Sequence, residues 1–117
     1  MEILTAEQLA EMTCAPGESG VARYPDDKVA EQLGHLDGWQ VTEDGKRIRK
    51  EWTVANFLAG LEFFSQVGEI AEEICHHPDL HLVGYKNLAI EIWTHTLDGL
   101  SENDFILAAK INRIPAR

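Results

Sequence analysis

The residues of this chain best suited to acid–base chemistry are histidines in its C-terminal half. His76, His77 and His81 fall within six consecutive positions, and His95 ends a later predicted strand. Imidazole titrates near neutral pH, so a histidine can donate or accept a proton there. Two adjacent histidines followed by Pro78 are hard to explain by core packing. We therefore interpret His76, His77 and His95 as a proton-transfer site.

Two carboxylates stand near these histidines in the sequence. Glu72 precedes His76 by four residues, so the two side chains are neighbours if both lie on a helix. Together with the dipole at the helix C-terminus, Glu72 would favour the protonated imidazole. Asp104 follows His95 by nine residues, in the first turn of a predicted helix. We expect both carboxylates to serve the site.

A zinc site and a purely structural role are the alternatives for the same residues. His76, His77 and His81 form a His-His-Pro-x-x-His arrangement, and histidines at such spacings can bind zinc. Sequence neighbours in an extended chain point in different directions, which disfavours shared ligation by His76 and His77. On a strand, His81 could simply face solvent. These interpretations stay open at this point, and we favour proton transfer without a metal.

Periodicity and capping signals define the elements that would position these groups. Apolar residues at helical spacing predict a long helix over Val54–Cys75, capped by Thr53 and ended by Pro78. The Asp44-Gly45 pair predicts a tight hairpin turn. Three further helices are predicted: Thr5–Met12, residues 26–33 with Asp26 or Asp27 as the cap, and a last helix that begins after a capping box at Ser101–Asp104. Four strands are predicted, one beginning at Trp39 and the others over Ile48–Trp52, Leu80–Val83 and Leu88–Thr94.

The order of these elements predicts an α+β fold. The pattern α-β-β-α-β-β-α is typical of a four-stranded antiparallel sheet with helices packed on one face. We expect residues 26–117 to form this domain. Residues 1–25, with turn formers concentrated in residues 13–20, are expected to be an N-terminal extension that packs loosely or serves as an arm.

The long predicted helix carries more apolar residues than one buried face needs. Phe63 and Ile70 widen its apolar stripe. Either the helix is deeply buried, or a second apolar face binds another copy of the chain. We favour a homo-oligomer, because a large exposed apolar patch would otherwise remain.

The charge and cysteine content exclude several classes of partner. The chain contains 20 acidic and 10 basic residues, which gives a net charge of −10. This balance opposes binding to nucleic acids and to anionic membrane surfaces. No basic region precedes an apolar stretch at the N-terminus, so we expect neither a secretion signal nor a membrane span. Cys14 and Cys75 form no recognisable framework and are expected to be reduced thiols of a cytoplasmic protein.

The spacing of these residues resembles that of the pterin-4a-carbinolamine dehydratase family. That family has an acidic residue, three intervening positions, His-His-Pro, an aromatic residue, a Thr-His pair and an Asp about nine residues later. The matching residues here are Glu72, His76, His77, Pro78, Tyr85, Thr94, His95 and Asp104, and Gly38-Trp39 is similar to the family's Gly-Trp at the first strand. The family commonly has Asp or Asn where this chain has Cys75. The resemblance extends over about 27–114.

The resemblance implies dehydration of a 4a-hydroxytetrahydropterin to the quinonoid dihydropterin, as in tetrahydrobiopterin recycling. This reaction needs acids and bases with pKa values near neutral, and no metal or other cofactor. The implied roles are an acid–base pair for His76 and His95 and pterin binding for His77. Four further residues would complete the substrate site: Glu72 as the partner that keeps His76 protonated, Asp104 in contact with His95 or the pterin, Trp39 as a wall, and Pro78 beside the histidines.

Members resembling this family also include non-catalytic assembly or dimerisation factors, such as Rubisco assembly factors. The wide apolar helix and acidic surface are compatible with such a role, whereas the retained His-His-Pro and Thr-His favour the enzyme. The resemblance also implies a homo-oligomer, as a dimer or a tetramer.

Overall fold

The computed structural model describes residues 2–14 and 20–117, so part of the expected turn-rich segment 13–20 lies outside the described residues. Its elements along the chain are α1 (Ala6–Ala10), α2 (Asp26–Leu33), β1 (Gln40–Val41), β2 (Ile48–Thr53), α3 (Phe57–Ile74), β3 (Asp79–Val83), β4 (Asn87–Ile92), the short 3-10 helix η2 (His95–Leu97) and α4 (Glu102–Ile111).

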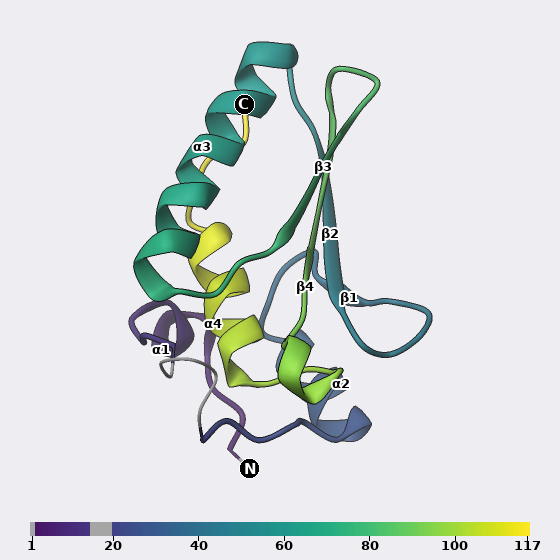
Figure 1. Ribbon diagram of the computed structural model, residues 1–117, viewed down its shortest axis with the longest axis vertical. Coiled ribbons are helices and arrows are strands. Elements are labelled where there is room, and N and C mark those ends of the chain that lie inside the picture. The colour runs from purple at the N-terminus through teal and green to yellow at the C-terminus, as the bar shows by residue number, and fades with distance from the viewer. Residues whose placement is uncertain (1, 15–19) are drawn as a thin grey trace.

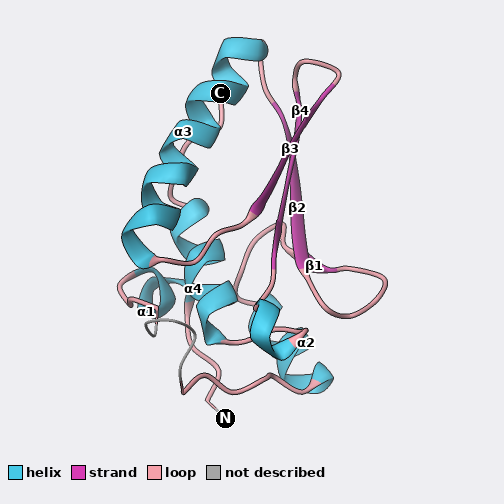
Figure 2. Ribbon diagram, viewed as in Figure 1, coloured by secondary structure: helices cyan, strands magenta, loops and turns pink. Residues whose placement is uncertain are grey.

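The strands form one antiparallel sheet in the order β1-β2-β4-β3. Figures 1 and 2 show α3 and α4 along one side of this sheet, with α1 beside α4 and α2 near the lower end of the molecule. The predicted α+β fold, with helices packed on one face of a four-stranded antiparallel sheet, is therefore confirmed.

Two tight turns set the register of the hairpins. In the β1–β2 turn, Gly45 has a φ of 75°, as the Asp-Gly signal predicted. The Asp44 carboxylate accepts hydrogen bonds from the Thr42 hydroxyl at 2.6 Å and from the Lys46 N–H at 3.0 Å. The β3–β4 turn has φ values of 58° at both Gly84 and Tyr85, and such turns match the twist of the paired strands.

The capping residues of two helices differ from those predicted. Asn56 caps α3, accepting a hydrogen bond from the Ala59 N–H at 2.8 Å, because Thr53 is still paired in β2. The helix therefore begins three residues later than expected. Pro25 precedes α2, so Asp26 lies inside its first turn, where a carboxylate still interacts favourably with the helix dipole.

The core lies between the sheet and the two long helices, and it changes the interpretation of α3. Phe63 is only 2% exposed and packs against Trp52 of β2 at 5.0 Å between ring centroids, so it cannot supply a second apolar surface. Ile70 is half-buried against the same core. The exposed apolar residues of α3 are instead Phe57, Leu58 and Leu61 in its first turns. The helical period alone could not distinguish these two stripes, since both are apolar.

The described part of the N-terminal segment is firmly packed, contrary to the expected loose arm. Leu9 of α1 is fully buried in the common core. The Gln32 side chain of α2 bonds both the N–H and the carbonyl of Leu4, and Lys110 of α4 donates to the Ala10 carbonyl at 2.9 Å. A local sequence pattern does not reveal these long-range partners.

We expect Leu9→Ala to lower the free energy of unfolding by about 2–5 kcal/mol, because it leaves a cavity in the core. Glu7→Ala on the exposed side of the same helix should change it by no more than about 0.5 kcal/mol. Urea unfolding measures both variants. Equal, small effects would show that α1 does not belong to the cooperative core.

Candidate functional site

The centre of the candidate site is a buried carboxylate, Asp104, in the first turn of α4. The side chains of Asp104 and His76 are 0% and 3% exposed, and Asp104 Oδ1 lies 2.7 Å from His76 Nε2. The second carboxylate oxygen accepts hydrogen bonds from the Ser101 N–H and from the Thr94 hydroxyl, each at 2.8 Å. One side chain thus connects three separate segments of the chain.

The predicted capping box explains how the carboxylate comes to lie there. The Ser101 side chain accepts a hydrogen bond from the Asp104 N–H, and the Asp104 carboxylate accepts one from the Ser101 N–H. The helix N-terminus favours a negative charge at this position. Burial raises the pKa of Asp104, while hydrogen bonds from His76, the Ser101 N–H and the Thr94 hydroxyl act in the opposite direction. The carboxylate is therefore closely coupled to the protonation of its neighbours.

The end of α3 sends the two adjacent histidines in different directions. Cys75 caps the helix in the left-handed region, with φ 54° and ψ 40°. Beyond it His76 turns inward to Asp104, whereas His77 is exposed and its Nε2 lies 3.2 Å from Glu72 Oε1. The expected pairing of Glu72 with His76 is therefore wrong. The four-residue spacing assumed that the helix continues to residue 76, but it ends two residues earlier.

His95 lies on the surface and opens the 3-10 helix η2. Its ring is stacked on Trp93, with 4.3 Å between the ring centroids and 35° between the planes. Asp104 bonds to the side chain of Thr94, the residue just before His95, rather than to the His95 imidazole. The carboxylate thus fixes the backbone from which His95 projects. Asp104 was expected to contact His95 or the pterin, and the described residues show no direct contact with the His95 imidazole.

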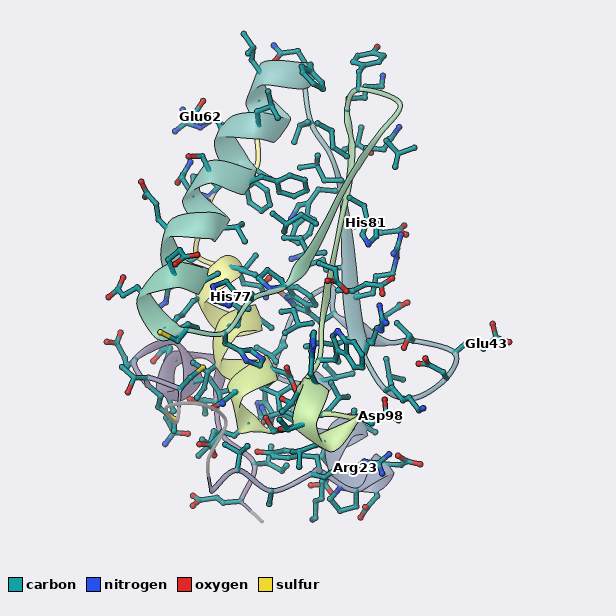
Figure 3. All side chains as sticks on the ribbon, in the orientation of Figure 1. Arg23, Glu43, Glu62, His77, His81 and Asp98 are labelled. Atoms are coloured by element: carbon teal, nitrogen blue, oxygen red, sulfur yellow. The ribbon has the colours of Figure 1, made fainter. Side chains whose placement is uncertain are left out.

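A surface groove of about 580 Å³ runs beside His77. Pro78 and Glu72 also line it, together with Gly68, Glu69, Ala71 and Leu80, but His76 and His95 do not. Figure 3 shows His77 at the lower end of α3, whereas His81 lies on the opposite side of the sheet. The structure thus brings Glu72, His77 and Pro78 together in one place and His76 with Asp104 in another.

Trp39 is placed away from these histidines. It is 3% exposed, packs edge-on against Trp52 at 6.0 Å, and donates from Nε1 to Asn112 Oδ1 at 2.9 Å. Asn112 caps the C-terminal end of α4, whereas Asp104 occupies its first turn. Trp39 therefore belongs to the packing of the fold at the far end of α4.

The three histidines of the zinc alternative have different surroundings. His76 faces Asp104, His77 faces Glu72, and His81 lines a separate hollow with Arg49 on the open face of the sheet. In residues 2–14 and 20–117, no group of three His, Cys, Asp or Glu side chains has the geometry to hold a metal ion.

Two features of the site were missed in the sequence. Thr94 and Ser101 were recognised only as a family match and a helix cap, yet both are fully buried and their hydroxyl oxygens lie 2.7 Å apart beside Asp104. Trp93, on the solvent side of the strand pattern, carries the His95 ring. A tryptophan at a position where alternation predicts a polar residue was the available signal for the second feature.

The chain is similar in sequence to proteins of one family. The family model described as pterin 4 alpha carbinolamine dehydratase matches residues 22–114. The Arabidopsis thaliana protein named pterin-4-alpha-carbinolamine dehydratase 2, mitochondrial, is 45% identical over 109 residues, which are 91% of this chain and 58% of that relative. The chain thus spans little more than half of that relative's length.

Two solved structures share the fold. A crystal structure titled as a transcriptional coactivator/pterin dehydratase from Brucella melitensis has a TM-score of 0.73 and 28% sequence identity, and the match covers 78% of this chain and 96% of that one. A pterin dehydratase-like protein identified as a RuBisCO assembly factor has a TM-score of 0.54 and 18% identity, covering 64% of this chain and 86% of that one, and shows the fold alone.

Within the described residues, no helix combines the length and apolar character needed to cross a membrane.

The revised partner assignments give a direct test on stability. Asp104→Ala should lower the free energy of unfolding by about 3–5 kcal/mol, because it leaves buried donors without their acceptor. Glu72→Ala, which removes an exposed carboxylate, should change it by about 0.5 kcal/mol or less. Denaturant unfolding of the two variants compares them. A comparable loss in both would contradict the assignment of Asp104 as the buried partner of His76.

Proposed function

The chain belongs to the pterin-4a-carbinolamine dehydratase family, and we propose that it dehydrates a 4a-hydroxytetrahydropterin to the quinonoid dihydropterin. Enzymes that catalyse this reaction are hydro-lyases. The observation that carries the proposal is the double attachment of Asp104, which binds His76 through one oxygen and Thr94, next to His95, through the other. Asp104 thereby binds the His76 ring directly and also fixes the residue that precedes His95.

The proposed reaction suits histidine chemistry. The hydroxyl on C4a leaves as water after it receives a proton, and a ring nitrogen of the pterin loses a proton. The step moves protons and changes no oxidation state, so it requires a positioned acid and a positioned base with pKa values near the working pH. We assign these two roles to His76 and His95.

The environment of His76 fits an oriented acid–base group. Its Nε2 lies 2.7 Å from Asp104 Oδ1, so the ring is tied to a carboxylate that can accept or share a proton. A carboxylate on one nitrogen fixes both the ring orientation and the tautomer. The ring is 3% exposed, so the substrate must gain access to it, and bulk water is excluded from this side of the reaction. His95, by contrast, is already open to solvent.

Pterin binding is proposed for the segment around His77. The His77 side chain is 60% exposed and stands beside the groove that Pro78 and Glu72 also line. A flat heteroaromatic ring with polar edges suits an apolar wall next to an imidazole and a carboxylate. In this proposal Asp104 positions the histidines, and Trp39 stabilises the fold without touching the pterin.

The substrate places the proposed activity after another reaction. A pterin that carries a hydroxyl on C4a is the product of a pterin-dependent hydroxylase. Removal of water from it regenerates a form that can be reduced again. We therefore propose a role in tetrahydrobiopterin recycling.

A second candidate function is a non-catalytic assembly or dimerisation factor, and one observation favours it. Phe57, Leu58 and Leu61 are 48%, 74% and 43% exposed at the start of α3, which gives the chain an apolar surface. Titration with a reduced pterin separates the two candidates, because only the enzyme requires a pterin site.

The same surface leads us to propose a homo-oligomer, a dimer or a tetramer. Light scattering at micromolar concentration should give a mass that is a multiple of the chain mass of 13.1 kDa. Leu58→Asp should shift the mass towards a single chain, because a charge replaces an apolar contact, whereas Ser65→Asp on the same helix should not. A mass near 13.1 kDa for the unmodified protein would contradict the proposal.

Kinetics test the proposed histidine roles. Replacing either His76 or His95 by Ala should lower kcat about 10²–10⁴-fold, the usual contribution of a positioned proton-transfer group. His77→Ala should raise KM more than it lowers kcat, and a metal chelator should leave the rate unchanged. A dehydration assay with a synthetic carbinolamine measures all of these.

Full activity in the His76→Ala/His95→Ala double variant would contradict the acid–base assignment. Loss of activity with a chelator, restored by zinc, would favour the metal alternative instead.

A further inference from the structure

Trp93 occupies an unusual position for a large aromatic residue. It follows β4 on the face opposite to Ile90 and Ile92, which point into the core, and so lies on the open face of the sheet. The indole Nε1 is buried and has no hydrogen-bond partner within the described residues. An unpaired buried donor costs about 1–3 kcal/mol. The core does not require a tryptophan here, so its position calls for another explanation.

The indole ring has two close neighbours. The His95 ring stacks on it at 4.3 Å between centroids, and the guanidinium carbon of Arg47 lies 4.3 Å from the indole centroid. Both contacts use the face of the indole. Arg47 immediately precedes β2, the strand that pairs with β4 in the sheet.

Arg47 is held in place by carboxylates from two other strands. Its Nη1 lies 3.0 Å from Glu91 Oε1 and 3.3 Å from Asp79 Oδ2. The other oxygen of Glu91 accepts from Arg49 Nη1 at 2.6 Å. Burial alone would raise the pKa of Glu91, but the hydrogen bonds from Arg49 and Arg47 outweigh it and hold the pKa below its usual value. The guanidinium is thus fixed over the indole by groups that remain charged.

The His95 imidazole depends on this arrangement for its orientation. Thr94 fixes the backbone through its bonds to Gly99 and Asp104. The imidazole itself forms no side-chain hydrogen bond or ion pair in the part of the chain that the structure describes, and its ring contact is with Trp93. Stacking occupies the face of the imidazole and leaves both nitrogens, which lie in the ring plane, available to a substrate.

We propose that Trp93, held in place by Arg47, supports the His95 ring and positions its imidazole for proton transfer. Trp93 and Arg47 are positioning residues, since they act through His95. The inference rests on the proposed function and assigns to it two residues that the His-His-Pro and Thr-His pattern does not contain. A misplacement of about 1 Å in a reacting group can lower a rate about 10²-fold, so the contact between Trp93 and His95 has a measurable effect on turnover.

The test is a double-mutant comparison in the carbinolamine dehydration assay. Trp93→Leu should lower kcat about 10–100-fold with KM changed less than about threefold. Trp93→Phe, which keeps a stacking ring, should recover most of the rate. In a His95→Gln background, Trp93→Leu should cause no further loss, because residues acting as a unit are not additive. Arg47→Gln should lower kcat, whereas Arg113→Gln, which breaks an exposed ion pair with Glu11, should not.

An equal loss of kcat from Trp93→Leu in the wild-type and His95→Gln backgrounds would overturn the inference, as would an unchanged kcat. A wild-type chain without turnover would contradict the proposed function, and with it the catalytic role of the contact between Trp93 and His95.

A spectroscopic measurement checks the contact without relying on turnover. A protonated imidazole in contact with an indole quenches its fluorescence. The emission of Trp93 is the difference between the fluorescence of the wild type and that of Trp93→Phe. This difference should decrease as His95 becomes protonated, and its dependence on pH should vanish in His95→Gln. Unchanged pH dependence in His95→Gln would show that the two rings are not in contact in solution, and would overturn the proposal that Trp93 positions His95.

Discussion

The organisation of the site depends on satisfying one buried carboxylate. A charge taken out of water is costly unless hydrogen bonds replace its hydration. Asp104 meets this requirement with donors from three places: the His76 ring, the Ser101 N–H and the Thr94 hydroxyl. The end of α3, the start of α4 and the chain after β4 must therefore converge on one point. The antiparallel sheet and the short turn closed by the Thr94–Gly99 bridge make this convergence possible.

The left-handed residue at the end of α3 is the second constraint, because it gives two adjacent histidines different environments. With Cys75 at a φ of 54°, the chain leaves the helix so that His76 enters the core and His77 stays on the surface. Residues other than glycine adopt this conformation at some cost, and Asn and Asp adopt it most readily. This offers a physical reason for the Asp or Asn that the family commonly has at this position. One histidine can then be held rigidly while its neighbour remains free to meet a ligand.

Local signals in the sequence predicted much of the fold but little of how its parts meet. The Asp44-Gly45 turn and the capping box at Ser101–Asp104 were predicted correctly because each is decided by neighbouring residues. The burial of Phe63 and the tight packing of Leu9 depend on distant segments that no local pattern specifies.

The candidate site shows the same division between local and long-range information. The residue types at His76, His77, His95 and Asp104 were evident, but their partners were not. Glu72 was assigned to His76 on the assumption of a continuous helix, which Cys75 interrupts. NMR of the histidine side chains tests the central role of Asp104 most directly. The account predicts a proton in the His76 Nε2 hydrogen bond that exchanges slowly with water and loses this protection in Asp104→Asn. A His76 Nε2 without a protected proton, or with exchange as rapid as that of the exposed His77, would contradict it.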